Sequence, residues 1–500
     1  MCSMRRMMHL IKKEMLIPAG RYTSMLMEYL YWIFISVYVI VVVATIINVL
    51  MDNRLPVKTM AWVMVLAFMP VVGIVLYFFF GQDTRKEKLI SQHSLDLLTK
   101  RSMLEFAVQT DLKVPDGSET LVKLFASQNW AMPFKDNAVD IYTTGYDFFS
   151  SLFREIGAAK SSIHLDTYIF DHDSLGQLLA DMLIDKAREG VEVRVIYDDV
   201  GCWNVHDSFF KRMRDAGIKV MPFMPVRFPA FTSKVNYRNH RKLCVIDGRV
   251  GFIGGMNVAK RYVTGTDGHS WRDTHLKIVG GAVYAIQRAF LIDWYFVSGT
   301  LITDRRYYPE LLGNVKNDIV IQIVTSSPVE KWPDIMQGYV RILLEARRYV
   351  YIETPYFLPT ETVMSAMRIA ALAGVDVRIM IPRHGDAKFV EWASRSYVFE
   401  TIQAGVKVYL YRPGFLHSKL LVCDDIVCTC GSTNVDFRSF ENNFEANAFI
   451  YDRETTLRFK QIFMDDIKEC NFVTERMISR KRPFAQRLWE SVVRLLSPLL

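Results

Sequence analysis

The sequence predicts an α/β protein in which a two-helix transmembrane hairpin at the N-terminal end precedes two duplicated α/β domains that pack face to face. Three observations support this prediction. Two long uncharged apolar runs stand near the N-terminus, short apolar runs then alternate with helical patterns, and this alternation occurs twice with similar sequences. With 500 residues, of which 51% are hydrophobic and 23% charged, the chain has room for two or three domains.

The transmembrane hairpin is predicted at 29–82, with spans at about 29–51 and 59–80 that contain no charged residue. Each span is long enough to cross a hydrocarbon core of about 30 Å. Two buried core helices are a weaker interpretation because they would need a very large core, and the first span is too long for a cleaved signal peptide. Pro70 and Gly73 are tolerable in the second span if neighbouring groups satisfy the freed backbone.

Charged residues around the spans predict their orientation. The basic N-terminal segment 1–28 and the start of the linker at 83–136 hold more Lys and Arg than the short loop between the spans. The positive-inside rule therefore predicts a multi-pass protein of the cytoplasmic membrane, with the two α/β domains and both termini in the cytoplasm. The seven cysteines, an odd number, suit a reducing compartment. Cys428 and Cys430 could form a metal pair, but no second pair accompanies them and we interpret them as buried strand residues.

The first α/β domain is predicted at 137–312 and the second at 313–472. Residues 161–170 read as a strand, 175–190 as a helix that ends at Gly190, and 191–199 as another strand. The sequence from 346 to 357 resembles that from 159 to 170, and the sequence from 373 to 382 resembles that from 189 to 198. The second domain is therefore a duplicate of the first.

Each copy contains one H-x-K-x-x-x-x-D motif, and an asparagine that closes a small-residue turn follows each histidine by seventeen residues. The members are His240, Lys242, Asp247 and Asn257 in the first copy, and His417, Lys419, Asp424 and Asn434 in the second. His275 and Lys277 share only the H-x-K spacing, without the aspartate or the turn. We interpret these two as strand residues.

Strand geometry suggests what the motifs do. Alternating side chains place each histidine and its lysine on one face, whereas Asp247 and Asp424 have the opposite parity and are expected to organise the following turns. If the two copies pack face to face, two histidines and two lysines converge. Such a cluster suits a phosphodiester: lysines and asparagines hold the non-bridging oxygens, one imidazole attacks phosphorus, and the other protonates the leaving oxygen. Asp273 and Glu445, at corresponding places, are candidates to orient the histidines, the alternative being surface strand charges.

The paired segments HRKLCVIDG with GGMN, and HSKLLVCDD with GSTNVDFRSFENNFE, resemble the phospholipase D superfamily. The second apolar run, YDDVG at 197–201, ETPYFLP at 353–359 and the terminal SPLL are similar to bacterial cardiolipin synthases. The resemblance implies a phosphatidyltransferase that needs no cofactor and no metal. One phosphatidylglycerol gives its phosphatidyl group to the enzyme and releases glycerol, and a second takes the group up as cardiolipin. It further implies that His240 forms a phosphohistidine and that His417 acts as general acid, then base. Cysteines at 423, 428 and 430 depart from the family pattern.

The sequence is compatible to different degrees with several other functions. The same motifs could hydrolyse phospholipid or make phosphatidylserine, since only the acceptor that reaches the intermediate differs. A nuclease is disfavoured because two spans confine the site to a membrane and no dense basic stretch with interleaved aromatics suggests a nucleic-acid groove. An inactive lipid-binding scaffold predicts decay of one motif, which neither copy shows. A transporter or channel has no intramembrane charge to support it.

The tail at 473–500 and the net charge of +8 suggest contact with anionic phospholipid. Apolar residues recur at helical spacing in the tail, with Arg487, Glu490 and Arg494 on the other side, and Pro498 is expected to end the helix. The helix either packs on the protein or lies in the lipid interface.

Overall fold

The computed structural model describes residues 19–51, 56–77, 112–129, 131–226, 237–266, 268–310, 315, 317–474, 483–495 and 497. These residues belong to two compact units, 1–83 and 84–500. Most of the predicted basic N-terminal segment and the first part of the predicted linker, together with residues 78–80 of the second predicted span, lie outside the described residues.

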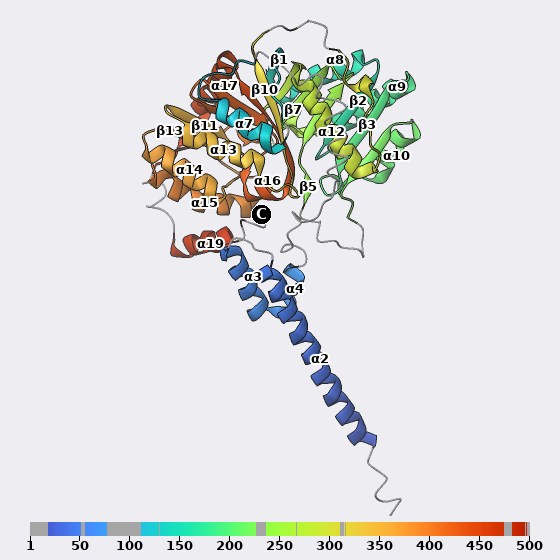
Figure 1. Cartoon of the computed structure of the whole chain (residues 1–500), viewed down its shortest axis with the longest axis vertical. Coiled ribbons are helices and arrows are strands. Elements are labelled where there is room, and N and C mark those ends of the chain that lie inside the picture. The colour runs from blue at the N-terminus through green and yellow to red at the C-terminus, as the bar shows by residue number, and fades with distance from the viewer. Residues whose placement is uncertain are drawn as a thin grey trace, which may run out of the picture. The chain divides into compact units, whose positions relative to one another are not determined.

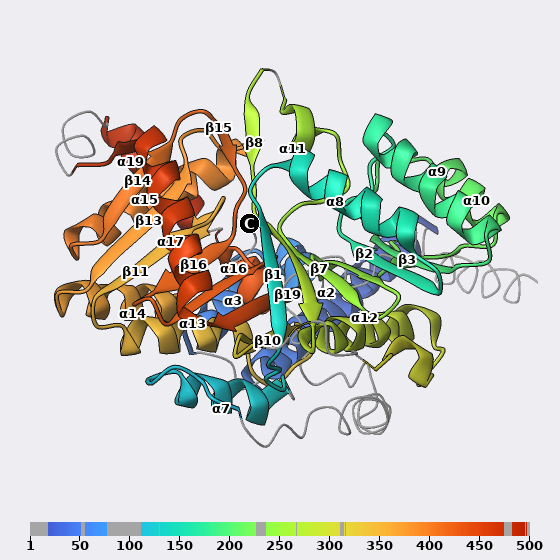
Figure 2. The same cartoon turned by 90° about the horizontal axis from the view of Figure 1, so that it is seen from above.

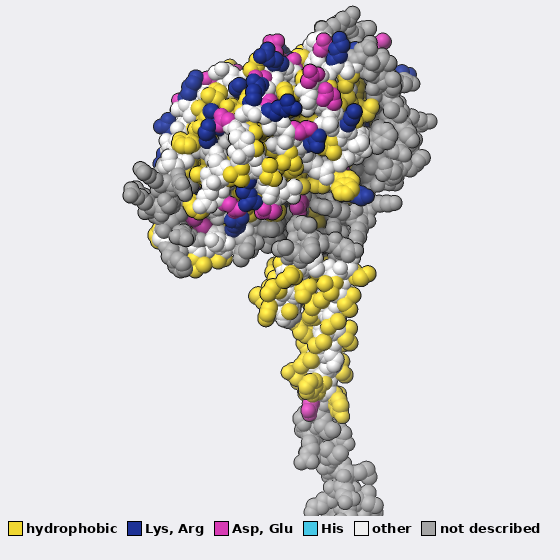
Figure 3. Space-filling model, turned by 60° about the vertical axis from the view of Figure 1, so that its left-hand side comes forward, with side chains coloured by type: hydrophobic (Ala, Val, Ile, Leu, Met, Phe, Trp, Pro, Cys, Tyr) yellow, Lys and Arg dark blue, Asp and Glu magenta, His cyan; other side chains and the backbone are white. Residues whose placement is uncertain are grey.

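The first unit is built from apolar helices whose side chains are mostly exposed (Figure 3). Helix α2 (Ala19–Met51) contains an apolar stretch, Leu26–Met51, and is the one helix among the described residues that is long and apolar enough to cross a membrane. The predicted second span is not one helix: α3 (Pro56–Phe68) ends before Met69, and α4 (Pro70–Leu76) begins after it.

The interruption at Met69 has a local cause. Pro70 has no amide hydrogen and disfavours helical dihedrals at the residue before it, and Met69 accordingly adopts φ −133° and ψ 59°. Beyond the break, Gly73 lies against α3 so closely that a Cβ would stand 2.9 Å from the carbonyl oxygen of Val65. The prediction of two uninterrupted spans is therefore not confirmed.

The first half of the second unit contains a seven-stranded sheet. Its order is β1 (Asn137–Tyr142), β9 (His275–Gly280), β7 (Val250–Gly254), β6 (Lys242–Ile246), β2 (Ser162–Thr167), β3 (Glu192–Asp198) and β4 (Lys219–Phe223). Helices α8 (Gly145–Ala158), α9 (Ser174–Arg188) and α10 (Asp207–Asp215) cover one face, and α12 (Ala282–Ser298) covers the other (Figure 2). Because both faces are covered, every residue of β2 is buried, including the polar His164 and Asp166.

The predicted strand–helix–strand order is present in this half. Strands β2 and β3 are parallel, and α9 connects them. The side chain of Asp173 begins α9 by accepting the N–H groups of Leu175 and Gly176. Gly190, at φ +91°, lies just beyond its last turn, as the sequence predicted.

The second half repeats the same strand order. Its sheet runs β10 (Val320–Ser326), β19 (Asn443–Tyr451), β17 (Val427–Gly431), β16 (Leu420–Cys423), β11 (Tyr349–Glu353), β13 (Asp376–Pro382), β14 (Lys407–Tyr411) and β20 (Cys470–Phe472). Helices α13 (Asp334–Glu345), α14 (Glu361–Leu372) and α15 (Lys388–Gln403) pack on one face, and α17 (Arg453–Asp466) packs on the other. The first seven strands correspond one for one to those of the first half, which confirms the duplication. The two halves lie side by side in Figure 1, with β2 and β3 in one half and β11 and β13 in the other.

One hydrophobic core joins the halves. It includes the inner faces of both sheets together with α12 and α17. Two short strands cross between the halves: β5 (Arg238–Asn239) pairs with β19, and β15 (Gly414–Leu416) pairs with β8 (Ser270–Arg272). The two halves are thus joined by backbone hydrogen bonds as well as by apolar packing.

The predicted linker and tail both contain helices that pack on the second half. Helix α7 (Glu119–Asn129) places Phe125 against Phe449, with ring centroids 4.5 Å apart, so the linker is not featureless. Helix α19 (Phe484–Leu495) packs on α15, whereas Pro498, which was expected to end the helix, lies outside the described residues. Among the side chains of α19 that the structure describes, Glu490 and Val493 are buried, and Glu490 belongs to the side that the sequence suggested was polar.

The apolar side of α19 therefore faces outward. Arg494 pairs with Glu400 at 2.9 Å and its guanidinium lies over the ring of Tyr397, which fixes the polar side against α15. Leu488, Trp489 and Val492 remain 54%, 45% and 43% exposed, and Phe389 of α15 beside them is 51% exposed. We call these four side chains the apolar stripe.

Candidate active site

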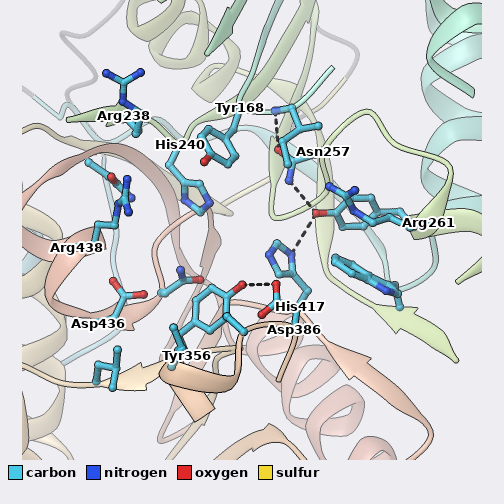
Figure 4. Close-up of a pocket in the computed structure, with 18 residues that line it drawn as sticks. Tyr168, Arg238, His240, Asn257, Arg261, Tyr356, Asp386, His417, Asp436 and Arg438 are labelled. Atoms are coloured by element: carbon cyan, nitrogen blue, oxygen red, sulfur yellow. Dashed lines mark hydrogen bonds between the residues drawn. The ribbon is translucent and has the colours of Figure 1, made fainter. Parts of the chain in front are cut away.

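Each motif histidine is positioned by a strand that pairs with the other half. His240 follows β5, and its N–H donates to the carbonyl of Phe444 on β19 at 2.9 Å. His417 follows β15, and its N–H donates to the carbonyl of Arg272 on β8 at 2.7 Å. Both imidazoles consequently reach one pocket of about 320 Å³ between the halves, which Asn257 and Asn434 also line (Figure 4).

A carboxylate of the second half holds the histidine of the first. Nδ1 of His240 donates to Glu445, whose two oxygens lie 3.0 and 3.1 Å away. Ser432 and Asn443 also donate to this carboxylate. Burial lowers the pKa of His240 to about 4. Burial alone would raise the pKa of Glu445, but the His240 ring and Lys242 outweigh it and hold that pKa below its usual value. The imidazole is therefore neutral near pH 7, with the Nε2 lone pair unprotonated.

The reciprocal pair joins the histidine of the second half to a carboxylate of the first. A hydrogen bond of 2.6 Å links Nδ1 of His417 to Oδ2 of Asp273. Burial, followed by the charges of Lys419 and Lys242, lowers the pKa of His417 well below its usual value, and burial raises that of Asp273. Sequence spacing put both carboxylates at corresponding places but did not indicate that each serves the other half. Asp273 also lies between β8 and β9 rather than on a strand.

Each motif lysine forms a hydrogen bond with the histidine of its own motif. Nζ of Lys242 donates to the carbonyl of His240, and Nζ of Lys419 donates to the carbonyl of His417 and lies 3.0 Å from its Nδ1. Burial lowers the pKa of Lys242 to about 7 and that of Lys419 to about 8. A phosphodiester in the pocket would restore their positive charge by Coulombic attraction.

The carboxylates of the two motif aspartates accept hydrogen bonds from backbone groups and none from either histidine. Asp247 accepts the N–H groups of residues 160, 161 and 162 at 2.7–2.9 Å, and Asp424 accepts those of 347, 348 and 349 at 2.6–2.9 Å. Both adopt a positive φ, at 54° and 52°. Each carboxylate ties the turn after its motif strand to the start of a neighbouring strand, as strand parity suggested.

Three arginines of the pocket, Arg238, Arg261 and Arg438, were missed by the sequence analysis. Arg261, in α11 (Arg261–Thr264), and Arg438, in α16 (Phe437–Glu441), line the pocket from opposite sides (Figure 4). Each of these two stands four residues after its asparagine, Asn257 or Asn434. This shared spacing was a signal available in the sequence.

The remaining sequence interpretations concern residues outside the pocket. His275 and Lys277 lie on β9, where the His275 ring stacks on Phe148, so they are strand residues as predicted. Cys428 and Cys430 are fully buried on β17, as the preferred interpretation held.

Comparison with known proteins gives concordant matches. The family model described as "Cardiolipin synthase, PLD-like domain" matches residues 152–279 and again 339–467. A second family, described as "Phospholipase D-nuclease N-terminal", matches residues 32–82. The cardiolipin synthase of a Geobacillus species is 39% identical over 458 residues, which are 90% of each chain. The major cardiolipin synthase of Bacillus subtilis is 39% identical over 481 residues, 93% of this chain and 98% of that one.

A solved structure shares the fold. The phosphatidylserine synthase of Haemophilus influenzae superposes with a TM-score of 0.58 at 15% identity, covering 77% of this chain and all of that one. At this identity the likeness concerns the fold alone.

Asp247→Ala should destabilise the protein without impairing catalysis. The substitution leaves three N–H groups without their acceptor and places alanine at a positive φ, so the free energy of unfolding should fall by about 1–3 kcal/mol. Urea unfolding of the solubilised protein measures this, with the exposed Asp140→Ala as control. A normal stability combined with lost activity per folded molecule would contradict this structural role and indicate that Asp247 takes part in catalysis.

On the alkaline side of the pH–activity profile, activity should begin to decline at an unusually low pH. Each lysine is charged only below its pKa, so attraction for phosphate is present at low pH and is lost as pH rises above about 7 to 8. We expect kcat/KM for phosphatidylglycerol to decline there. Preincubation at each pH, followed by assay at neutral pH, controls for unfolding. A decline only near pH 10, where free lysine titrates, would contradict the assignment.

Proposed function

Because the chain belongs to the cardiolipin synthase family of the phospholipase D superfamily, we propose that its two histidines transfer a phosphatidyl group by a double displacement at one site. The enzyme is a phosphatidyltransferase acting on phospholipids, and the reaction joins two phosphatidylglycerol molecules into cardiolipin and glycerol. The observation that supports a single shared site is the crossed pairing, in which Glu445 holds His240 and Asp273 holds His417.

The first step forms the intermediate. The Nε2 lone pair of His240 attacks phosphorus, a P–N bond forms, and the bond from phosphorus to the glycerol oxygen breaks. His417 gives its proton to that oxygen as glycerol leaves. His417 must carry a proton at this point. The charges of Lys419 and Lys242 lower the pKa of His417. The negative charge of the substrate offsets these two charges and so raises the pKa of His417 again.

The second step reverses the roles. The hydroxyl of a second phosphatidylglycerol gives its proton to His417, its oxygen bonds to phosphorus, and the P–N bond to His240 breaks. Lys242, Lys419, Asn257 and Asn434 are the groups that we assign to the non-bridging oxygens in both steps. Asp247 and Asp424 have no part in this chemistry.

We further propose that the protein sits on the cytoplasmic membrane with its catalytic domains and both termini in the cytoplasm. The Leu26–Met51 stretch of α2 supports an anchor, and α3 with α4 would complete a hairpin by lying beside it. The apolar stripe supports a second contact with lipid. It borders the pocket, since Ala387 and Val390 at the start of α15 line the pocket while Phe389 points outward.

Substitution of either histidine should abolish both products. With phosphatidylglycerol labelled in its head group, purified protein should release glycerol and form cardiolipin, and His240→Ala and His417→Ala should each reduce both rates by at least about a thousandfold. The exposed His172→Ala serves as control. Phosphatidic acid as the sole lipid product would instead identify a hydrolase. Activity that survived either substitution would mean that the motifs form separate sites.

Polar substitution of the apolar stripe should weaken the use of bilayer substrate. We expect Leu488→Gln combined with Trp489→Gln to raise the apparent KM for phosphatidylglycerol in proteoliposomes several-fold, because less apolar area enters the lipid. Turnover of dispersed short-chain phosphatidylglycerol should not change. Leu178→Gln combined with Trp203→Gln, at exposed sites elsewhere, is the matched control. An equal KM in proteoliposomes would contradict lipid contact at the stripe.

A further inference from the structure

Three arginines line the pocket. Arg238 belongs to the same half as His240 and forms an ion pair with Asp198 at 3.5 Å, whereas Arg261 and Arg438 each lie on the side of a histidine that the other half contributes. Arg261 belongs to the first half and lies with Tyr262 and Trp271, which contact His417. Arg438 belongs to the second half, and its charge acts on Tyr168, whose ring meets that of His240 with centroids 5.1 Å apart. Arg261 and Arg438 are therefore crossed in the same way as the carboxylates.

The surroundings of Arg261 hold its guanidinium in place by two aromatic rings and one long ion pair. The group lies over the ring of Trp271 at 5.2 Å and near that of Tyr262 at 5.9 Å. Its nearest carboxylate is Asp171, at 3.8 Å, and both side chains are part-exposed, at 30% and 40%. Nε of Arg261 has no hydrogen-bond partner among the described residues. A stacked guanidinium whose one printed ion pair is long and partly exposed is well suited to take a phosphate through its remaining N–H groups.

The side of the pocket on which Arg261 lies matters for the second step. The attacking hydroxyl must approach phosphorus opposite His240, and therefore beside His417. Tyr262, the residue after Arg261, also lies on this side, because its hydroxyl is 3.4 Å from Nδ1 of His417. In phosphatidylglycerol, the attacking hydroxyl and the lipid's own phosphate stand at the two ends of one glycerol. The acceptor phosphate must consequently lie on the His417 side. Water and free glycerol bring no such phosphate.

We propose that Arg261 binds the phosphate of the acceptor lipid and thereby selects a phospholipid alcohol over water and free glycerol. Arg438, on the His240 side, serves the donor half of the reaction and does not discriminate between acceptors. The inference rests on the proposed function, including His240 as the nucleophile. It assigns the preference for transfer over hydrolysis to one side chain.

The test compares Arg261→Gln with Arg438→Gln in the full-length protein. Phosphatidylglycerol labelled in its acyl chains gives the ratio of cardiolipin to phosphatidic acid. Incorporation of labelled glycerol into phosphatidylglycerol measures attack by an acceptor that has no phosphate. For Arg261→Gln we expect that ratio to fall about tenfold while glycerol incorporation stays within about twofold of wild type, which also shows that the variant is folded. Arg261→Lys, which keeps the positive charge but loses the paired N–H donors of the guanidinium, should give an intermediate ratio.

The matched variant should behave differently. Arg438→Gln is expected to slow cardiolipin formation, hydrolysis and glycerol incorporation together and to leave the product ratio unchanged. An unchanged ratio in Arg261→Gln, or a ratio that falls in Arg438→Gln instead, would overturn the inference while leaving the transfer reaction intact. Absence of both cardiolipin formation and glycerol incorporation in the wild type would reject the proposed function, and the inference with it.

Discussion

The structure of the site depends on two hydrogen bonds between imidazole and carboxylate that cross from one half to the other. Glu445 holds Nδ1 of His240, and Asp273 holds that of His417. Neither half contains a complete pair, so a single copy cannot orient its own histidine. The parallel strand pairs β5–β19 and β15–β8 supply the backbone registration that makes these contacts possible, and the shared hydrophobic core fixes the sheets that bear them. The duplication thus creates a function that neither copy has alone.

Burial then sets the protonation states with which the site begins. Removal of these groups from water favours their neutral forms, which explains why the pKa values of both histidines and both lysines are lowered. An anionic phosphodiester reverses this effect by attracting positive charge back to the lysines and to His417. Binding of the anionic substrate therefore favours the protonated forms of the lysines and of His417, whereas a neutral alcohol alone would not.

The sequence predicted the chemistry of the site more fully than its architecture. The two motif histidines, with Asn257 and Asn434, were found because a fixed spacing recurred, and the opposite parity of Asp247 and Asp424 correctly separated them from the histidines. Which half each carboxylate serves depends on long-range strand pairing, which local spacing does not encode. The break at Met69 follows from Pro70, a residue whose effect was underestimated. The outward face of α19 could not be predicted, because an ion pair from Arg494 to Glu400 determines which side is buried.

The most direct test of the crossed arrangement is a rapid-quench measurement of the covalent intermediate with phosphatidyl-p-nitrophenol, whose leaving group needs no proton. Mass spectrometry would locate the adduct in wild type, Glu445→Gln and Asp273→Asn. We expect an adduct on His240 in the wild type and slow formation of the same adduct in Glu445→Gln. In Asp273→Asn we expect formation at the normal rate followed by accumulation, because breakdown needs His417 as a base. An adduct on His417, or the opposite behaviour of the two variants, would contradict the account.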